Sequence, residues 1–209
     1  MEHHHDSRFG KPLYALPAHI EPLDAARGTI LALDWRALRT LGFYAEYEAA
    51  IEPEQRPALL ASTPGSWVQL ELLFAHYRAL DSMALQEDAI RLVGRTVGEG
   101  VHGSFLSTLI RLAGQLGVSP WLALEQCYKL WVRSWRGGAI SVHRTGERLA
   151  HVELMATPVC FSRFFCISFA SALCAGIAPF GSNPEAHELA TTRTHSSVTF
   201  RVSWDALQL

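Results

Sequence analysis

The chain has 209 residues, of which 49% are hydrophobic and 18% are charged, and its formal net charge is -2. This composition excludes a disordered chain, because it holds enough apolar residues to build the core of a domain. The 18 Lys and Arg and 20 Asp and Glu form no basic block, so we expect no nucleic-acid partner.

The N-terminal segment, residues 1–28, predicts an irregular arm that contains prolines. Its start, "MEHHHDSRFGKP", lacks the apolar stretch of a signal peptide. The four cysteines form no CxxC pair, which is typical of buried thiols in a reducing compartment. We therefore expect a cytoplasmic protein in which residues 29–209 form one domain, helical over 29–136 and sheet-containing over 137–209.

The region after the arm predicts helices. Asp34 is a candidate N-cap and Gly42 a candidate C-terminal stop of a short first helix. In the helix predicted over residues 65–80, Ser66 is the candidate N-cap. His76 lies opposite the main apolar row of this helix, so we expect His76 to be exposed. The spacing of apolar residues predicts longer helices over 65–80, 85–100, 104–117 and 119–135.

Glycines and aromatic residues define two details of these helices. The run "GRTVGEG" predicts close helix packing followed by a break at Gly98–Gly100. Ser119 and Pro120 are a favoured N-cap and first helical residue. The last of these helices carries a stripe at steps of three and four residues: Trp121, Leu124, Tyr128, Trp131 and Trp135.

The periodicity then changes to that of strands. "GGAISVHRTGERLAHVELM" predicts a hairpin, and a loop of residues 145–147 would pair Ile140 with Val152 and keep the apolar residues on one face. A separate expectation is that His143 and His151 face each other across the strands on the exposed outer face.

An apolar segment over residues 158–180 follows the hairpin and is nearly long enough to span a bilayer. Arg163 and several serines lie within it, so we expect a helix buried inside the domain and no stable membrane insertion. "EAHELATTRT" and "THSSVTFRVSW" predict two further strands, the last with its alternate apolar residues buried. The predicted fold class is α/β (α+β): N-terminal helices, then an antiparallel four-stranded sheet (β-β-α-β-β) packed by helices.

Motifs of known enzymes are missing from the sequence. It contains no G-x-S-x-G elbow, Walker A loop, H-E-x-x-H or paired C-x-x-C. We therefore expect no catalytic residues, no metal ligands and no enzymatic activity.

Aromatic side chains between the long helices and the sheet are the main candidate site, because bulky flat residues there can border an apolar cavity. Arg163 needs a partner and could reach solvent, pair with Glu153 or hold a ligand's acid group. His102 is either a ligand-binding residue at the mouth of such a pocket or a residue that caps and packs the helix. The candidate ligand-binding residues are Trp131, Trp135, Tyr128, Phe161, Phe165, Phe169, Arg163 and His102.

Two functions agree with these observations. The first is a non-enzymatic sensing or adaptor domain that binds an apolar small molecule or lipid-like group, such as an acyl chain, between helix and sheet. The alternative is a protein-protein interaction or dimerisation module with a fully packed core and no ligand. We expect either a homodimer or a protein partner.

Three segments, "RLVGRTVGEG", "LWVRSWRGGAISVHRTGERLAHVEL" and "VTFRVSW", carry a resemblance. The chain resembles an uncharacterised bacterial family of about 200 residues. That family is similar to 4-vinyl-reductase-like domains, heme-nitric-oxide-binding domains and the small subunits of the TRAPP trafficking complex. The resemblance implies a mixed α/β fold, binding of small hydrophobic ligands or partner proteins, and dimerisation.

The resemblance also bears on cofactors. Vinyl-reductase-like domains carry cysteines near the last two strands, where this chain has "HELATTRTHSSVTF" without cysteine. The heme-binding branch uses a helical histidine and a Tyr-x-Ser-x-Arg motif; the motif is missing here, and only His102 matches the histidine by position. TRAPP-type relatives hold an acyl chain, which implies Cys160, Cys166 or Cys174 as alternatives. We therefore expect no cofactor and regard heme as disfavoured.

Overall fold

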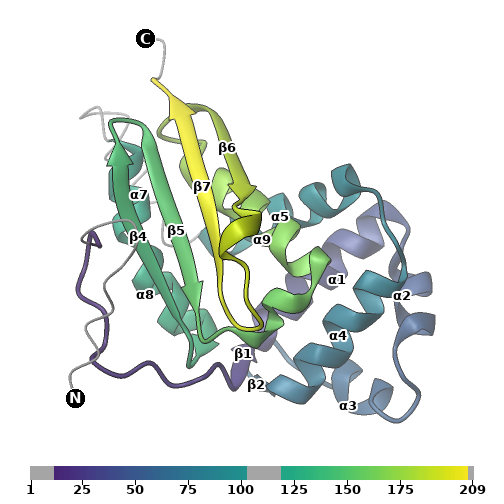
Figure 1. Ribbon diagram of the computed structural model, residues 1–209. Helices are drawn as coiled ribbons and strands as arrows, with labels where there is room; N and C mark the ends of the chain where they lie inside the picture. Colours follow the sequence, from purple (N-terminus) through teal and green to yellow (C-terminus); the bar gives the residue numbers. More distant parts are fainter. Residues whose placement is uncertain (1–11, 103–118, 207–209) are drawn as a thin grey trace.

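The computed structural model describes residues 12–102 and 119–206. The predicted α+β class with an antiparallel sheet is confirmed (Figure 1). The strands are β1 (Ala25–Arg27), β2 (Trp67–Gln69), β3 (Trp135–Arg136), β4 (Ala139–Gly146), β5 (Leu149–Met155), β6 (Ser182–Glu188) and β7 (Val198–Asp205). The helices are α1 (Gly28–Leu41), α2 (Tyr44–Ala50), α3 (Arg56–Leu60), α4 (Leu70–Ser82), α5 (Glu87–His102), α7 (Pro120–Glu125), α8 (Cys127–Ser134) and α9 (Arg163–Ile177).

The main sheet has four antiparallel strands in the order β4-β5-β7-β6. Figure 1 shows α7, α8 and α9 behind this sheet and α1 to α4 beside it. A second, small sheet of order β2-β1-β3 joins the helical part to the start of the β4–β5 hairpin. The inward residues of β7 are buried as predicted: Val198, Phe200, Val202 and Trp204.

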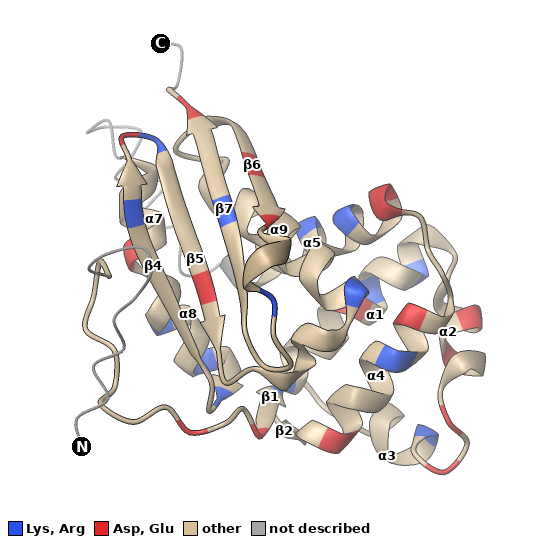
Figure 2. Ribbon diagram, in the orientation of Figure 1, with Lys and Arg blue, Asp and Glu red and all other residues tan. Residues whose placement is uncertain are grey.

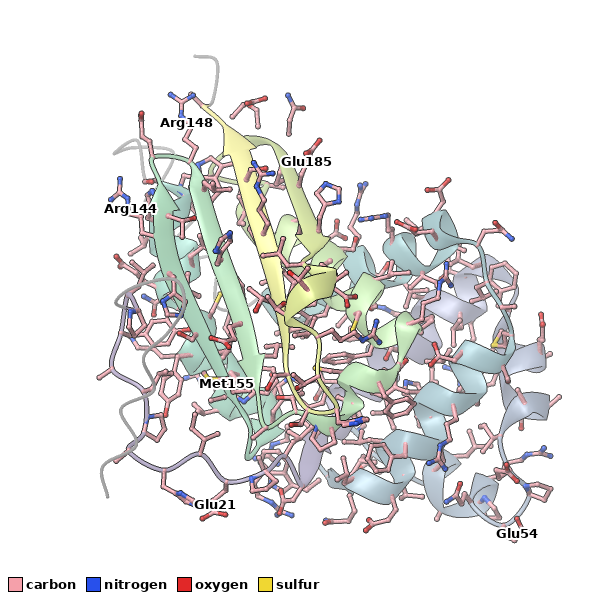
Figure 3. The ribbon with its side chains drawn as sticks, in the orientation of Figure 1. Glu21, Glu54, Arg144, Arg148, Met155 and Glu185 are labelled. Carbon is pink, nitrogen blue, oxygen red and sulfur yellow. The ribbon has the colours of Figure 1, made fainter. Side chains whose placement is uncertain are left out.

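The hairpin register differs from the prediction. Ile140 pairs with Leu154 instead of Val152, and the observed register itself changes between Arg144 and Gly146. The apolar face stays the same because the shift is two residues, which preserves the side on which each side chain lies. Figure 3 places Arg144 and Arg148 at the turn end of this hairpin and Met155 at the opposite end.

His143 and His151 pair across the strands as predicted, but the expected exposure of His143 is wrong. His143 is fully buried, and the N-terminal arm pairs with β4 at this residue. Pro12 forms an isolated bridge with His143, and the Leu13 N–H donates to the Val142 carbonyl at 2.8 Å. Part of the arm therefore pairs with the edge of β4, which is the outermost strand of the main sheet.

The first helix begins six residues before Asp34, so the predicted N-cap at Asp34 is wrong. Backbone carbonyls satisfy the first N–H groups instead: Gly28 donates to Ser66 at 2.9 Å and Thr29 to Pro64 at 3.1 Å. Asp34 is consequently an interior helical residue and is buried. The predicted stop at Gly42 is confirmed, since Gly42 adopts a left-handed conformation.

Two other predicted helix boundaries are wrong. Residues 67–69 form β2 because they pair with β1, so α4 begins at Leu70 and Ser66 does not cap it. The helix predicted over 119–135 is divided at Gln126 into α7 and α8, although Ser119 does cap α7. The helix predicted over 104–117 lies outside the described residues.

The apolar segment forms α9, which is buried against α5 and the sheet. Across residues 12–102 and 119–206, no helix is both long and apolar enough to cross a membrane. The break predicted at Gly98–Gly100 is wrong, since α5 continues to His102. Over the described residues, Figure 2 shows acidic and basic residues interspersed on the helices.

Candidate functional site

A cavity of about 100 Å³ lies between the helices and the start of β4. Most of its wall is apolar, and α5, α8 and α9 contribute most of the residues. An apolar, concave wall with few polar groups is typical of small-molecule sites. The lining residues are Ile30, Asp34, Tyr77, Val97, Gly98, Val101, Cys127, Leu130, Trp131, Ser134, Trp135, Ile140, Phe165, Ser168, Phe169, Ala172 and Leu173.

Four aromatic rings form one side of this wall. Trp131 stacks on Trp135 with ring centroids 5.4 Å apart, and Phe165 stacks on Phe169 at 5.7 Å. The two pairs meet where Trp135 contacts the edge of Phe165 at 5.9 Å. These separations and orientations are those that aromatic quadrupoles favour, so the rings hold one another in place.

The orientation of Trp131 is also fixed by a hydrogen bond. Its Nε1–H donates to the Gly137 carbonyl at 3.2 Å. Gly137 has φ 74°, and a side chain at this position would collide with Pro22. The tight turn after β3 therefore brings an acceptor within reach of the ring.

The polar part of the wall is the end of a buried hydrogen-bonded chain. Trp35 Nε1 donates to the Tyr47 hydroxyl at 3.1 Å. Tyr47 Oη lies 2.7 Å from His76 Nδ1, and His76 Nε2 lies 3.1 Å from Asp34 Oδ2. Four residues from α1, α2 and α4 are thereby joined in the core, and only Asp34 among them lines the cavity.

One assignment of protons satisfies every link of this chain. The indole N–H of Trp35 can only donate, so the Tyr47 oxygen accepts there and its own hydrogen points to His76 Nδ1. His76 Nε2 then carries a proton and donates to Asp34 Oδ2. The hydrogen bonds all run in one direction and end on the carboxyl group in the cavity wall.

The electrostatics of the wall follow from burial. Burial raises the pKa of Asp34 above its ordinary value, although the hydrogen bond and charge of His76 oppose this in part. Burial also raises the pKa of the Cys127 thiol to about 12, so the thiol is protonated at neutral pH. Burial raises the pKa of Tyr77 well above its ordinary value, and the charge of Asp34 raises it further.

Of the residues predicted to bind a ligand, four line the cavity: Trp131, Trp135, Phe165 and Phe169. Three others lie outside its wall. The ring of Tyr128 packs on that of Tyr14, with centroids 5.6 Å apart. Phe161 contacts the ring of Phe74 and is 42% exposed to solvent. Arg163 donates to the Leu85 carbonyl at 3.1 Å and not to Glu153. His102 is the last residue of α5, and its side chain is outside the described part.

Sequence reasoning missed the polar chain that ends at Asp34, and it wrongly expected His76 to be exposed. The error arose because α4 was started too early, which rotated the assumed buried face. The signal was present: Leu73, His76, Tyr77 and Leu80 follow one another at helical spacing, and all four are buried.

Comparisons with known proteins identify the fold. No protein-family model matches the sequence, and no curated protein matches it. Solved structures of H-NOX domains do match, each over most of its length, with sequence identities of 10% to 12%. The chain therefore has the H-NOX fold, and its resemblance to heme-nitric-oxide-binding domains is supported at the level of the fold.

Three of these structures illustrate the match. An H-NOX protein studied for heme distortion has a TM-score of 0.59 at 12% identity, covering 88% of this chain and 97% of that one. An oxygen-binding H-NOX domain related to soluble guanylate cyclases has a TM-score of 0.56 at 11% identity, covering 88% and 98%. An unliganded Fe(II) H-NOX variant from K. algicida has a TM-score of 0.58 at 10% identity, covering 86% and 96%.

These matches contradict the expectation that no cofactor binds. That expectation rested on the missing Tyr-x-Ser-x-Arg motif, whereas the proteins that share the fold include ones studied for their heme. A short motif is a poor guide at this level of identity, because a fold can persist after its local signatures have changed. The predicted homodimer, protein partner and TRAPP-type acyl chain stay predictions.

Proposed function

We propose that this chain is a non-enzymatic sensing domain that binds a small molecule in the cavity between α5, α8, α9 and β4. One observation carries the proposal: a mostly apolar cavity has a buried carboxyl group, Asp34, in its wall. Buried carboxyl groups are costly unless a partner satisfies them, so such a group in a cavity wall favours a binding role. The H-NOX fold of the neighbours supports a sensing domain.

Heme is the first ligand to consider, because it is named for proteins that share the fold. Protein ligands of heme iron include His, Cys, Met and Tyr. Among the described lining residues, Cys127 and Tyr77 belong to these types. The cavity of about 100 Å³ is too small for a porphyrin, so the wall as described does not fit heme unless α8 and α9 separate.

A compact apolar ligand is the second candidate, and the size of the cavity favours it. Engineered apolar cavities of about 150 Å³ bind benzene. A cavity of about 100 Å³ therefore suits a molecule of about one small ring. Such a ligand would contact the rings of Trp131, Trp135, Phe165 and Phe169 without any movement of the backbone.

The test measures binding to the whole chain and to a variant with a filled cavity. Val97 lines the cavity and Val132 of α8 is 49% exposed, so Val97→Phe fills the site and Val132→Phe is the matched control. We expect native mass spectrometry, or titration with hemin or benzene, to detect a ligand in the original chain and in Val132→Phe. Val97→Phe should lose it. The hemin titration is followed by the Soret band.

Two results would contradict the proposal. One is the failure of the original chain to bind hemin, benzene or a copurified molecule. The other is equal binding by Val97→Phe and the original chain, which would place the ligand elsewhere. Binding of hemin with loss in Val97→Phe would identify heme as the ligand of this cavity.

A further inference from the structure

The polar corner of the cavity offers hydrogen-bonding groups that the protein leaves open. Asp34 and Tyr77 both line the cavity, and their relative exposures are only 2% and 3%. Among the described residues, the Asp34 carboxyl accepts one hydrogen bond, from His76 Nε2 to Oδ2, and no hydrogen bond involves the Tyr77 hydroxyl. Buried polar groups are nearly always hydrogen-bonded, so this corner is suited to a ligand.

The chain behind Asp34 determines which kind of group that ligand presents. Tyr47 holds His76 in the orientation that donates to Asp34, and Trp35 holds Tyr47. Asp34 Oδ2 thus accepts from His76, and the carboxyl group has further acceptor sites that this one bond does not use. An acceptor in an apolar wall discriminates strongly, because a ligand without a donor leaves it unpaired.

The apolar part of the cavity wall limits the rest of the ligand. The rings of Trp131, Trp135, Phe165 and Phe169 and the side chains of Ile140 and Leu173 are apolar. These surfaces favour an apolar body, and the volume of about 100 Å³ restricts it to about one small ring. The donor and the body must therefore belong to one compact molecule.

We propose that this cavity selects a compact apolar ligand that carries one hydrogen-bond donor, which Asp34 accepts beside the Tyr77 hydroxyl. This inference rests on the proposed function, because it requires a ligand in the cavity. It goes further in assigning the ligand's chemical class and the residue that recognises it.

Pyrrole and furan provide the test, because they have nearly the same size and shape, and only pyrrole has an N–H donor. Dissociation constants for both are measured by calorimetry or ligand-observed NMR with the whole chain. We expect pyrrole to bind about tenfold more tightly than furan, as the gain of one buried hydrogen bond implies. The ratio of the two constants removes any effect that acts on both rings alike.

Two variants locate the discrimination. Asp34→Asn keeps an acceptor for His76 but turns a donor toward the cavity, so the pyrrole-to-furan preference should fall to about one. Tyr77→Phe keeps the ring and should reduce the preference by a smaller factor. Asp24→Asn makes the same chemical change at an exposed ion pair with Arg136 and should leave the ratio unchanged. Circular dichroism confirms that each variant is folded, and if Asp34→Asn does not fold, the ratio in Tyr77→Phe decides.

The outcomes separate this inference from the proposed function. Equal affinity for pyrrole and furan, or an unchanged ratio in Asp34→Asn, would overturn donor recognition while leaving the cavity as a binding site. Failure of both rings, with binding of hemin or benzene that Val97→Phe abolishes, would also overturn the inference alone. If no ligand binds the whole chain in either experiment, both proposals are wrong.

Discussion

Gly94 of α5 lies directly against the backbone of Ser168 in α9, where any side chain on Gly94 would overlap the Ser168 carbonyl group. Gly98, one turn later, is in a similar position: a Cβ there would come within 2.8 Å of the Ala172 carbonyl oxygen. The segment "GRTVGEG" therefore serves close helix packing, as predicted. Because Gly98, Ser168 and Ala172 also line the cavity, the same contact shapes one of its walls.

Gly94→Ala should destabilise the domain by about 1–3 kcal/mol, because two helix backbones must separate to accept the methyl group. The free energy of unfolding in urea measures this change. Gly65→Ala is the control, since a Cβ on Gly65 meets nothing within 4 Å, and this variant should stay close to the original stability. Equal stability of the two variants would show that α5 and α9 are not in backbone contact.

Tyr47→Phe should cost about 1–3 kcal/mol of unfolding free energy. Loss of the hydroxyl leaves both Trp35 Nε1 and His76 Nδ1 buried without their partner. Tyr44→Phe is the matched control, because Tyr44 lies in the same helix and is only partly buried. Chemical denaturation of both variants checks the prediction, and a Tyr47→Phe variant as stable as Tyr44→Phe would contradict the hydrogen-bonded chain.

Ser162→Ala should destabilise the domain by about 1 kcal/mol, since the Ser162 hydroxyl caps α9 by accepting from the Phe165 N–H at 3.0 Å. Ser162 is fully buried, so water cannot replace the lost acceptor. Ser119→Ala removes the cap of the short, exposed start of α7, where the distance is 3.3 Å, and should cost less. Thermal or urea unfolding ranks the two; the reverse ranking would be inconsistent with a buried cap on α9.

How much of this fold the sequence predicts depends on the range of the interactions. Features that depend on near neighbours were predicted correctly: the stop at Gly42, the cap at Ser119 and the alternation in β7. The start of α4 was not predicted correctly. Residues 67–69 form a strand, and not the first turn of the helix, because they pair with β1. Local propensity cannot report a partner forty residues away.

The candidate site divides in the same way. The aromatic side of the cavity was predicted, because Trp131 and Trp135, like Phe165 and Phe169, are four residues apart in the sequence, and large rings at this spacing predict a shared interface. The polar side was missed, because Asp34, Tyr47 and His76 come from three helices and form a group only after folding. His76 was misplaced because the assumed helix included residues 67–69, which belong to β2, so the apolar row was drawn on the wrong face.

Cys166 should make stability fall at alkaline pH. Burial, opposed in part by Arg193, raises the pKa of its thiol from 9.0 to about 12 in the folded state. Above pH 9 the unfolded chain loses this proton first, so the thiol's contribution is complete below pH 9 and is lost as the pH rises toward 12.

The measurement compares the unfolding free energy of the original chain with that of Cys166→Ala. Above pH 9 the original chain should lose unfolding free energy relative to Cys166→Ala by about 1 kcal/mol per pH unit. At pH 7 and 8 the difference should be constant, which gives an internal control. A difference that stays constant to pH 10.5 would mean that the thiol titrates normally in the folded state.

Strand β7 pairs with β5 on one side and with β6 on the other, yet it follows both of them in the chain. During synthesis, the β4–β5 hairpin, α9 and β6 all leave the ribosome before the strand that unites them. Until Val198–Asp205 emerges, β6 lacks its partner in the main sheet and the apolar edge of β5 stays open. The nascent chain thus passes through a stage with exposed strand edges, which favours aggregation until β7 pairs with both strands.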